Sequence, residues 1–225
     1  MLSSLALHPL GYYLAVGFCD KLRIYHILIS ELRNYKEIVL RGVCQLKFSN
    51  GGQMLAAAYS KQKYSIHLIN VYNSYTLEEL ARLSDHSSIV TELAWKADDR
   101  ALYSIGADGF VIEWKYEVRS ESKEWPCRKW SQGNSKYTSG LYERTAKSFL
   151  AAGQESGKNV VREYRLEKEL AQKIYTMGFR INKFQWLNSQ WNIPAIIAGT
   201  ECGTLKVFNC PFDNIVEQSI NIHLK

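Results

Sequence analysis

A histidine, a serine and an aspartate lie within one short segment, and these residue types together can form the catalytic triad of a hydrolase. His86 precedes the stretch YSIGADGFVIEW, which contains Ser104 and Asp108 and ends at Trp114. A triad needs an exposed serine beside groups that stabilise an oxyanion. Ser104 instead lies inside the apolar run ALYSI, without the G-x-S-x-G turn that exposes a nucleophilic serine. We therefore expect no catalytic residue here and no enzymatic activity.

Other patterns that suggest a bound metal or cofactor lack a necessary part. The stretch GQESGKN at 153–159 has three residues between its glycines, where a phosphate loop has four, and Asn159 replaces the Ser or Thr that would bind Mg²⁺. The five histidines share no ligand spacing, and the five cysteines form no C-x-x-C pair. We expect a simple turn at 153–159, reduced cysteines, no metal site and no cofactor.

The composition describes a chain with a large core and a modest basic excess. Of its 225 residues 46% are hydrophobic, and the formal net charge is +6. No apolar run approaches the ~20 residues of a membrane span, and the N-terminal stretch lacks the basic start of a signal peptide. We expect a chain on the cytoplasmic side that is not secreted and binds neither membrane nor nucleic acid. The positive charge favours acidic partners without identifying one.

An internal repeat indicates which elements position the polar residues. Five runs each contain an apolar pair, small residues, a turn and an alternating segment that ends in a large apolar residue. These final residues lie about 45 positions apart and are Tyr25, Ile69, Trp114, Tyr164 and Phe208. A second series of strand-like runs precedes them, from LALHPLG to FQWLNSQW. Alternation over four to six residues predicts half-buried strands, and we expect even the charged stretch REYRLEKELAQKIY to be an outer strand.

The repeat predicts an all-β, WD40-type β-propeller with about five blades. It spans residues 1–225, with units at approximately 1–38, 39–80, 81–130, 131–176 and 177–225. Such propellers most often have seven blades, and His223 lies where a sixth unit would begin. Either five blades close by themselves, or the chain is part of a longer propeller. We expect the second, an incomplete seven-bladed ring that another chain or further sequence completes. Because an open ring exposes apolar blade faces, we also expect the chain to be insoluble or partner-dependent by itself.

The resemblance of the third unit to WD repeats implies a structural role for the four residues introduced first. It implies a hydrogen-bond relay in which the Trp114 indole donates to Ser104, Ser104 donates to His86, and His86 donates to Asp108. Only this unit carries the full set, although the first unit keeps Asp20.

The segment KEWPCRKW, between the third and fourth units, interleaves cations with two tryptophans. One interpretation is an outer strand whose tryptophans fold against the blade. The other is an exposed loop that binds an acidic partner through charge and cation–π contacts. The candidate partner-binding residues are Lys123, Trp125, Arg128, Lys129 and Trp130.

Several longer stretches resemble the cilia- and flagella-associated protein 57 family of axonemal WD-repeat proteins. They are ALHPLGYYLAVGFCDKLRIYHILISELRNYKE, RGVCQLKFSNGGQMLAAA, WKADDRALYSIGADGFVIEWK and AGTECGTLKVFNCPF. The resemblance implies tandem seven-bladed propellers followed by coiled coils, on the doublet microtubule, where they help to seat inner dynein arms. The stretches ESKEWPCRKWSQGNSK and GQESGKN depart from that family.

On this resemblance we expect a non-enzymatic scaffold of the ciliary or flagellar axoneme, acting in cilium motility. Its expected partners are subunits of the inner dynein arm, radial spoke or regulatory complexes, tubulin, and a chain that completes the propeller. The alternative is a soluble cytosolic WD-repeat adaptor of a ubiquitin-ligase or trafficking complex. Presence in salt-extracted axonemes, as opposed to the soluble cell-body fraction, distinguishes the two.

Overall fold

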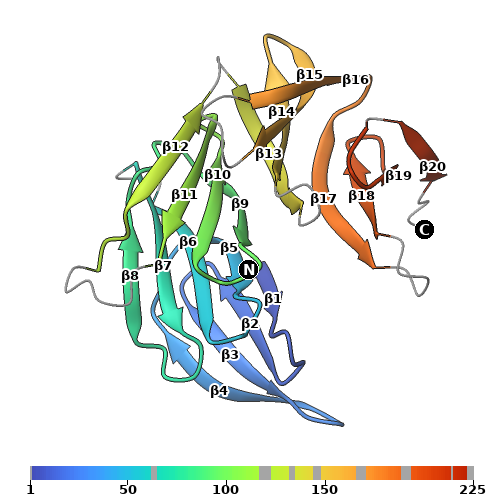
Figure 1. Ribbon diagram of the computed structural model, residues 1–225. Helices are drawn as coiled ribbons and strands as arrows, with labels where there is room; N and C mark the ends of the chain where they lie inside the picture. The colour runs from blue at the N-terminus through green and yellow to red at the C-terminus, as the bar shows by residue number, and fades with distance from the viewer. Residues whose placement is uncertain are drawn as a thin grey trace. The chain divides into compact units, whose positions relative to one another are not determined.

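The computed structural model describes residues 2–61, 65–116, 123–131, 135–143, 148–165, 171–188, 194–213 and 215–221. In these residues the chain forms twenty β-strands and no helix. The strands make five four-stranded sheets in which strands consecutive in sequence are neighbours, as Figure 1 shows. These sheets are blades of a WD40-type β-propeller, and the all-β prediction is confirmed. We number them blades 1 to 5 in chain order.

The strands of the first three blades have the following bounds. Blade 1 contains β1 (Leu2–Leu7), β2 (Tyr13–Phe18), β3 (Leu22–Ile27) and β4 (Leu32–Ile38). Blade 2 contains β5 (Val43–Phe48), β6 (Met54–Lys61), β7 (Ile66–Asn73) and β8 (Glu79–Leu83). Blade 3 contains β9 (Val90–Trp95), β10 (Ala101–Gly106), β11 (Phe110–Lys115) and β12 (Cys127–Ser131).

The last two blades continue the same pattern. Blade 4 contains β13 (Ser135–Glu143), β14 (Ser148–Glu155), β15 (Lys158–Arg165) and β16 (Ala171–Met177). Blade 5 contains β17 (Ile181–Asn188), β18 (Pro194–Thr200), β19 (Thr204–Asn209) and β20 (Val216–Asn221). The chain divides into two compact units. One comprises Met1–Asp108 and Ile112–Lys129, and the other comprises Gly109–Val111 and Trp130–Lys225.

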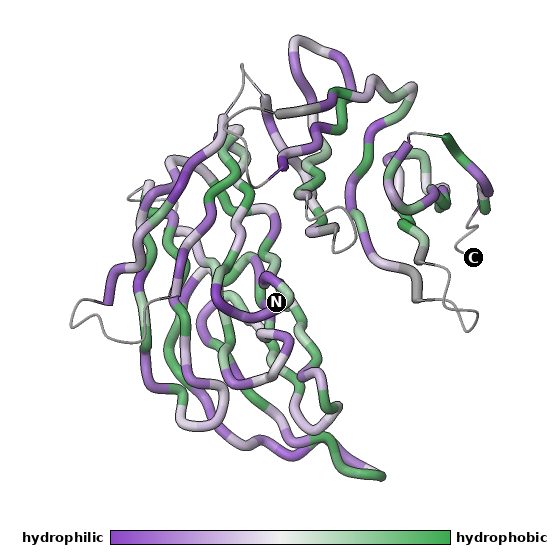
Figure 2. The backbone as a smooth tube through the Cα atoms, in the orientation of Figure 1, coloured by the Kyte–Doolittle hydropathy of each residue, from purple (hydrophilic) through white to green (hydrophobic). Residues whose placement is uncertain are grey.

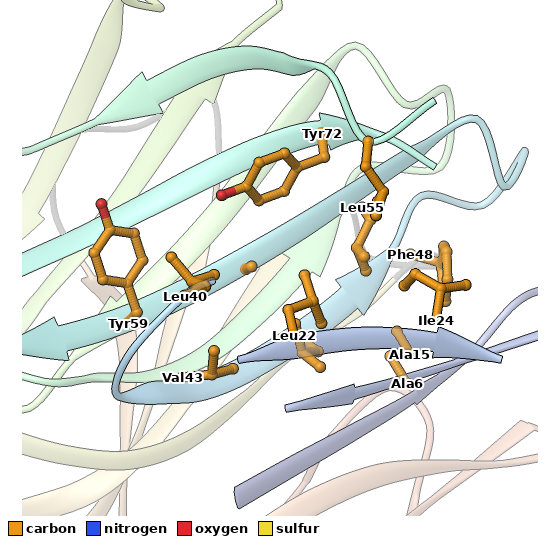
Figure 3. Close-up of a cluster of buried hydrophobic side chains, with 13 residues drawn as sticks. Ala6, Ala15, Leu22, Ile24, Leu40, Val43, Phe48, Leu55, Tyr59 and Tyr72 are labelled. Atoms are coloured by element: carbon orange, nitrogen blue, oxygen red, sulfur yellow. The ribbon is translucent and has the colours of Figure 1, made fainter. Parts of the chain in front are cut away.

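Each unit has an apolar core where neighbouring blades meet. In the first unit one face of blade 1, with Ala6, Ala15 and Ile24, packs against Phe48 and Leu55 of blade 2 (Figure 3). In the second unit a similar cluster joins blades 4 and 5. Alternating strands present one apolar face to the neighbouring blade, so that packing between blades buries apolar surface in each unit.

A tryptophan ties the first strand of one blade to the first strand of the blade before it. Trp95 Nε1 in β9 donates to the carbonyl oxygen of Lys47 in β5 at 3.2 Å. In the second unit Trp186 Nε1 in β17 donates to the carbonyl oxygen of Tyr142 in β13 at 3.0 Å. Each bond satisfies a donor that packing would otherwise bury unpaired, and so fixes how neighbouring blades are aligned.

Two features of the hairpins refine the sequence interpretation. The suspected phosphate loop is the tight β14–β15 hairpin, in which Ser156 and Gly157 both have positive φ, at 48° and 79°. That pair of conformations is the two-residue turn that suits twisted antiparallel strands. In blade 2 the register pairs Leu55 with Tyr72 and Ala58 with Ile69.

The residue that ends the second repeat is therefore Tyr72, and the choice of Ile69 was wrong. In blade 1 the equivalent register pairs Leu14 with Tyr25, and in blade 5 it pairs Ile196 with Phe208. The β6–β7 hairpin of blade 2 is longer than the β2–β3 hairpin of blade 1, and this shifts the large aromatic residue along the sequence.

Apolar side chains also reach the surface of blade 1. Figure 2 colours the tip of its β3–β4 hairpin as hydrophobic. Leu28 and Ile29, which lie between these two strands, are exposed. Leu5 and Leu7 on β1 are also more than half exposed, at 54% and 61%. No helix in the described part of the chain is long and apolar enough to cross a membrane.

Candidate functional site

The structure brings the four residues of the sequence-predicted relay together within blade 3. Trp114 Nε1 on β11 donates to Ser104 Oγ on β10 at 2.8 Å. His86 Nε2 lies 2.7 Å from the same Oγ. On its other side the ring's Nδ1 lies 3.0 Å from Asp108 Oδ2, and the Ser87 amide also donates to this oxygen at 2.8 Å.

With a neutral imidazole, only one set of donors satisfies this chain of contacts. The indole is a donor only, so Ser104 accepts from Trp114 and directs its own proton to His86 Nε2. His86 then carries its proton on Nδ1 and donates to the Asp108 carboxylate. The imidazole is thus held in one tautomer between two partners. An unpaired polar group buried at this place would cost about 1–3 kcal/mol.

The burial of the quartet makes it a structural element of the blade. Ser104 is 0% exposed, and the side chains of His86 and Asp108 are 1% and 4% exposed. A serine that attacks a substrate must be reachable by it and lie beside donors that stabilise an oxyanion. Ser104 is enclosed in a strand whose six residues are all buried. The geometry serves to satisfy buried polar groups.

The structure adds two residues to this site that sequence reasoning missed. Ser87 supplies a backbone donor to Asp108. Gly106 lies at the end of β10, and because it has no side chain there is room for His86 and Asp108 beside it. A Cβ atom there would lie 2.2 Å from Asp108 Oδ1 and 2.5 Å from His86 Nδ1. The only signal for Gly106 was its position just before the Ala-Asp-Gly turn.

The other blades fill the position of Ser104 with apolar side chains. In blade 3 Ser104 lies two residues after Leu102, which pairs with Trp95 of the first strand. The same register in the other blades places Val16, Ala57, Ala151 and Ala198 at the position of Ser104. All four are buried. In blade 1 Asp20 is exposed. Among the residues that the structure describes, only blade 3 contains the complete polar relay, and the other blades place buried apolar side chains at the point of Ser104.

Turns at one end of blades 1 to 3 make further polar contacts. His8, which is 1% exposed, has its Nε2 3.1 Å from the carbonyl oxygen of Gly52. The Asn50 side chain and the Gly51 amide donate to the Asp99 carboxylate at 2.7 and 2.6 Å. The repeat marked these positions as turns. Their pairing across blades was not predicted, because it depends on blade packing.

The segment from Lys123 to Trp130 divides into exposed cations and buried rings. The Lys123 side chain is 62% exposed, and its Nζ lies 3.9 Å from Glu79 Oε1. Lys129 Nζ lies 3.1 Å from Asp85 Oδ2. Arg128 is half-buried and has an interaction of its own. The cationic candidates therefore lie at the surface, and Lys123 is the most open of them.

The candidate partner-binding role of the two tryptophans needs correction. Trp125 is 6% exposed and Trp130 is 2% exposed. The Trp125 ring lies 5.1 Å from the ring of Tyr116 and 6.3 Å from the ring of Trp95, so it is part of the blade's own packing. Trp130 lies on the outer strand β12. Large aromatic rings gain more by burial against the blade than by exposure in a loop.

The described residues contain no candidate metal site, and the thiol of Cys127 is held in its protonated form. No group of three or more His, Cys, Asp or Glu side chains among them could hold a metal ion. Burial and the neighbouring Asp85 carboxylate raise the pKa of the Cys127 thiol to about 11. Cys127 Sγ donates to Asp85 Oδ2 at 2.9 Å.

Comparison with known proteins gives matches of two kinds. The family model described as "WD domain, G-beta repeat" matches residues 77–115, which include the relay. Cilia- and flagella-associated protein 57 of Mus musculus is 29% identical over 92% of this chain, which covers 15% of that protein. Cilia- and flagella-associated protein 57 C of Tetrahymena thermophila is 41% identical over 50% of this chain, which covers 9% of that protein.

A third similar protein has a different name. Jouberin of Rattus norvegicus is 37% identical over 36% of this chain and is covered over 8% of its own length. The chain thus spans less than a sixth of the length of each of these relatives. The blades, the WD match and the alignment over nearly the whole chain show a WD-repeat chain that is similar to cilia- and flagella-associated protein 57, which confirms the resemblance inferred from its residues.

Proposed function

We propose that this protein is a non-enzymatic scaffold of the cilium or flagellum that docks other protein complexes through its blades. The observation that carries the proposal is the alignment of 92% of the chain with a protein named for its association with cilia and flagella. The burial of Ser104 supports the same conclusion, because the serine of the Ser-His-Asp set in blade 3 is 0% exposed.

The proposed mechanism is the rigid presentation of loops and blade edges. Strands such as β10 are held by buried apolar packing and, in blade 3, by the polar relay. A surface mounted on such a frame loses little conformational entropy when a partner binds, which favours docking. Within this proposal the site of action is the axoneme, and the docked complexes include the inner dynein arms, radial spoke or regulatory subunits and tubulin.

The test is fractionation of ciliated cells that express the tagged full-length protein. We expect the tag to remain with axonemes after detergent and to resist moderate salt extraction. Recovery of the tag in the soluble cell-body fraction, together with subunits of a ubiquitin ligase or a vesicle coat, would contradict the axonemal role and favour a cytosolic adaptor.

A further inference from the structure

A hollow of about 460 Å³ lies against the outer strands of blade 2. The connection between β4 and β5 contributes Val39, Leu40 and Arg41, and β6, β7 and β8 contribute the remaining walls. A second hollow of about 330 Å³ shares Glu79 and Arg82 with the first and extends to Lys123. The two hollows therefore adjoin at the Glu79–Arg82 ion pair, which has an N–O distance of 3.0 Å.

The floor of the larger hollow is formed by buried polar and aromatic side chains. Tyr59 and Tyr72 are each 5% exposed, and Asn70 is 3% exposed. The Asn70 amide donates to the Tyr72 hydroxyl at 3.0 Å and to Glu79 Oε2 at 2.8 Å. Its Oδ1 atom accepts no hydrogen bond from the residues that the structure describes. The donor side of the amide is fixed, and the floor keeps one unused acceptor.

The rim of the hollow carries cations whose charge is not neutralised nearby. Arg41 and Lys61 are exposed, and neither forms an ion pair with the residues that the structure describes. Lys61 Nζ lies 6.0 Å from the centroid of the Tyr59 ring. The two hollows together are lined by the cations Arg41, Lys61, Arg82 and Lys123 and by the carboxylates Glu79 and Glu124.

We propose that this hollow, with Arg41 and Lys61 at its rim and Tyr59 and Tyr72 at its floor, binds an acidic peptide segment of a protein partner. Carboxylates of the peptide pair with the two unpaired cations, and its aliphatic carbons pack on the tyrosine rings. Two adjoining hollows offer far more room than one small anion fills, which favours an extended peptide. The proposal rests on the docking role above and specifies the chemistry of one docked partner.

The assignment also explains why Lys123 is the most open cation of its segment. Its Nζ extends toward Glu79, at the edge that the two hollows share. The acidic partner that the sequence suggested for the segment from Lys123 to Trp130 would therefore bind mainly on blade 2, with Lys123 at one end of the site. The buried tryptophans are not needed for it.

The experiment measures binding of a fluorescein-labelled, glutamate-rich twelve-residue peptide to the full chain by fluorescence anisotropy. The test variant is Arg41→Glu with Lys61→Glu. The control variant is Lys158→Glu with Lys173→Glu, two exposed lysines of blade 4 whose replacement changes the net charge almost identically. Circular dichroism melting of each variant shows that the fold is retained.

We expect the test variant to weaken binding about tenfold, since two attractive pairs become repulsive, and the control to change it less than about twofold. Equal losses in both variants would overturn the proposal, because binding would then follow net charge alone. Absence of binding to the wild-type chain would overturn it as well, as would tighter binding of a phosphoserine peptide that does not depend on Arg41 and Lys61. If the peptide result holds and the protein is absent from axonemes, the site stands and the ciliary role fails.

Discussion

Blade 3 and the outer edge of blade 2 use charged and polar residues in opposite ways. In blade 3 the side chains of His86, Ser104 and Asp108 are buried, and each lies within hydrogen-bond distance of a partner. At the edge of blade 2 Arg41 and Lys61 are exposed and have no carboxylate partner in the described chain. The first set resembles a catalytic site by residue type, and the second resembles an ordinary solvated surface.

The difference shows that exposure and partners decide what a polar residue can do. Polar groups that are buried and satisfied stabilise the fold, because separating them leaves an unpaired group in a region of low dielectric. Exposed cations that have no partner contribute little to stability and are free to bind. Substitutions in blade 3 should therefore change stability, and substitutions at the blade 2 edge should change binding only.

The largest effect is expected for Gly106→Ala. The added Cβ would lie within 2.5 Å of both Asp108 Oδ1 and His86 Nδ1, so the relay must break or the turn must shift. We expect a loss of about 2–4 kcal/mol in the free energy of unfolding, measured by urea denaturation. The control is Gly199→Ala in β18, where the nearest atom to the new Cβ is 4.0 Å away. If both variants lose the same stability, the close packing around the relay has no energetic importance.

A smaller effect is expected for Asp108→Ala. The substitution removes the acceptor of both His86 Nδ1 and the Ser87 amide. The buried His86 ring would then lack a partner for Nδ1, whereas the exposed Ser87 amide can turn to water. We expect destabilisation by about 2–3 kcal/mol. The control is Asp20→Ala in the first blade, an exposed residue at the corresponding turn, which should change stability by less than about 0.5 kcal/mol. An equal loss at Asp20 would remove the contrast between a relay aspartate and a surface one.

The cations at the blade 2 edge should matter little for folding. Arg41→Ala and Lys61→Ala remove no ion pair, so each should shift the free energy of unfolding by less than about 0.5 kcal/mol. The measurement is the same urea titration, with Glu79→Ala for comparison. Glu79 accepts from Asn70 and pairs with Arg82, and its loss should be more costly, about 1 kcal/mol or more. A greater loss for Arg41 than for Glu79 would mean that the rim is structural.

The smallest effect concerns the chemistry of one thiol. Burial and the Asp85 carboxylate raise the pKa of Cys127 to about 11. At pH 8 only about one thiol in a thousand is then the reactive thiolate. We expect slow alkylation of Cys127 by iodoacetamide at pH 8 and an increase in rate with pH up to the range of pH 11. Asp85→Asn removes the negative charge and should accelerate the reaction several-fold at pH 8, as measured by mass spectrometry of the modified peptide.

Much of the fold could be predicted from the sequence because local pattern and repeat agree. Alternating runs and turn residues indicated strands, and repetition about every 45 residues indicated blades. The longer β6–β7 hairpin of blade 2 was the exception. Both of its strands are extended, which moves the equivalent aromatic residue along the sequence without disturbing the alternation. The sequence therefore suggested Ile69 where Tyr72 occupies the equivalent place.

Less of the candidate sites could be predicted from the sequence. Burial of Trp125 follows from its contact with Trp95, a residue thirty positions earlier whose proximity depends on the fold. The hollow joins Arg41 to Lys61 and Asn70, from the β4–β5 connection and two different strands, and no motif relates them. Gly106 could have been noticed as a glycine beside a relay residue, but its importance lies in distances that only the structure supplies.

The most direct test of the account is a double-mutant cycle that combines Ser104→Ala with Asp108→Ala. His86 links the two side chains by its two ring nitrogens, so that removal of one partner changes what the other contributes. From urea titrations of the wild type, both single variants and the double variant, we predict a coupling energy of about 1 kcal/mol. Strict additivity of the two losses would contradict the claim that these residues act as one structural relay.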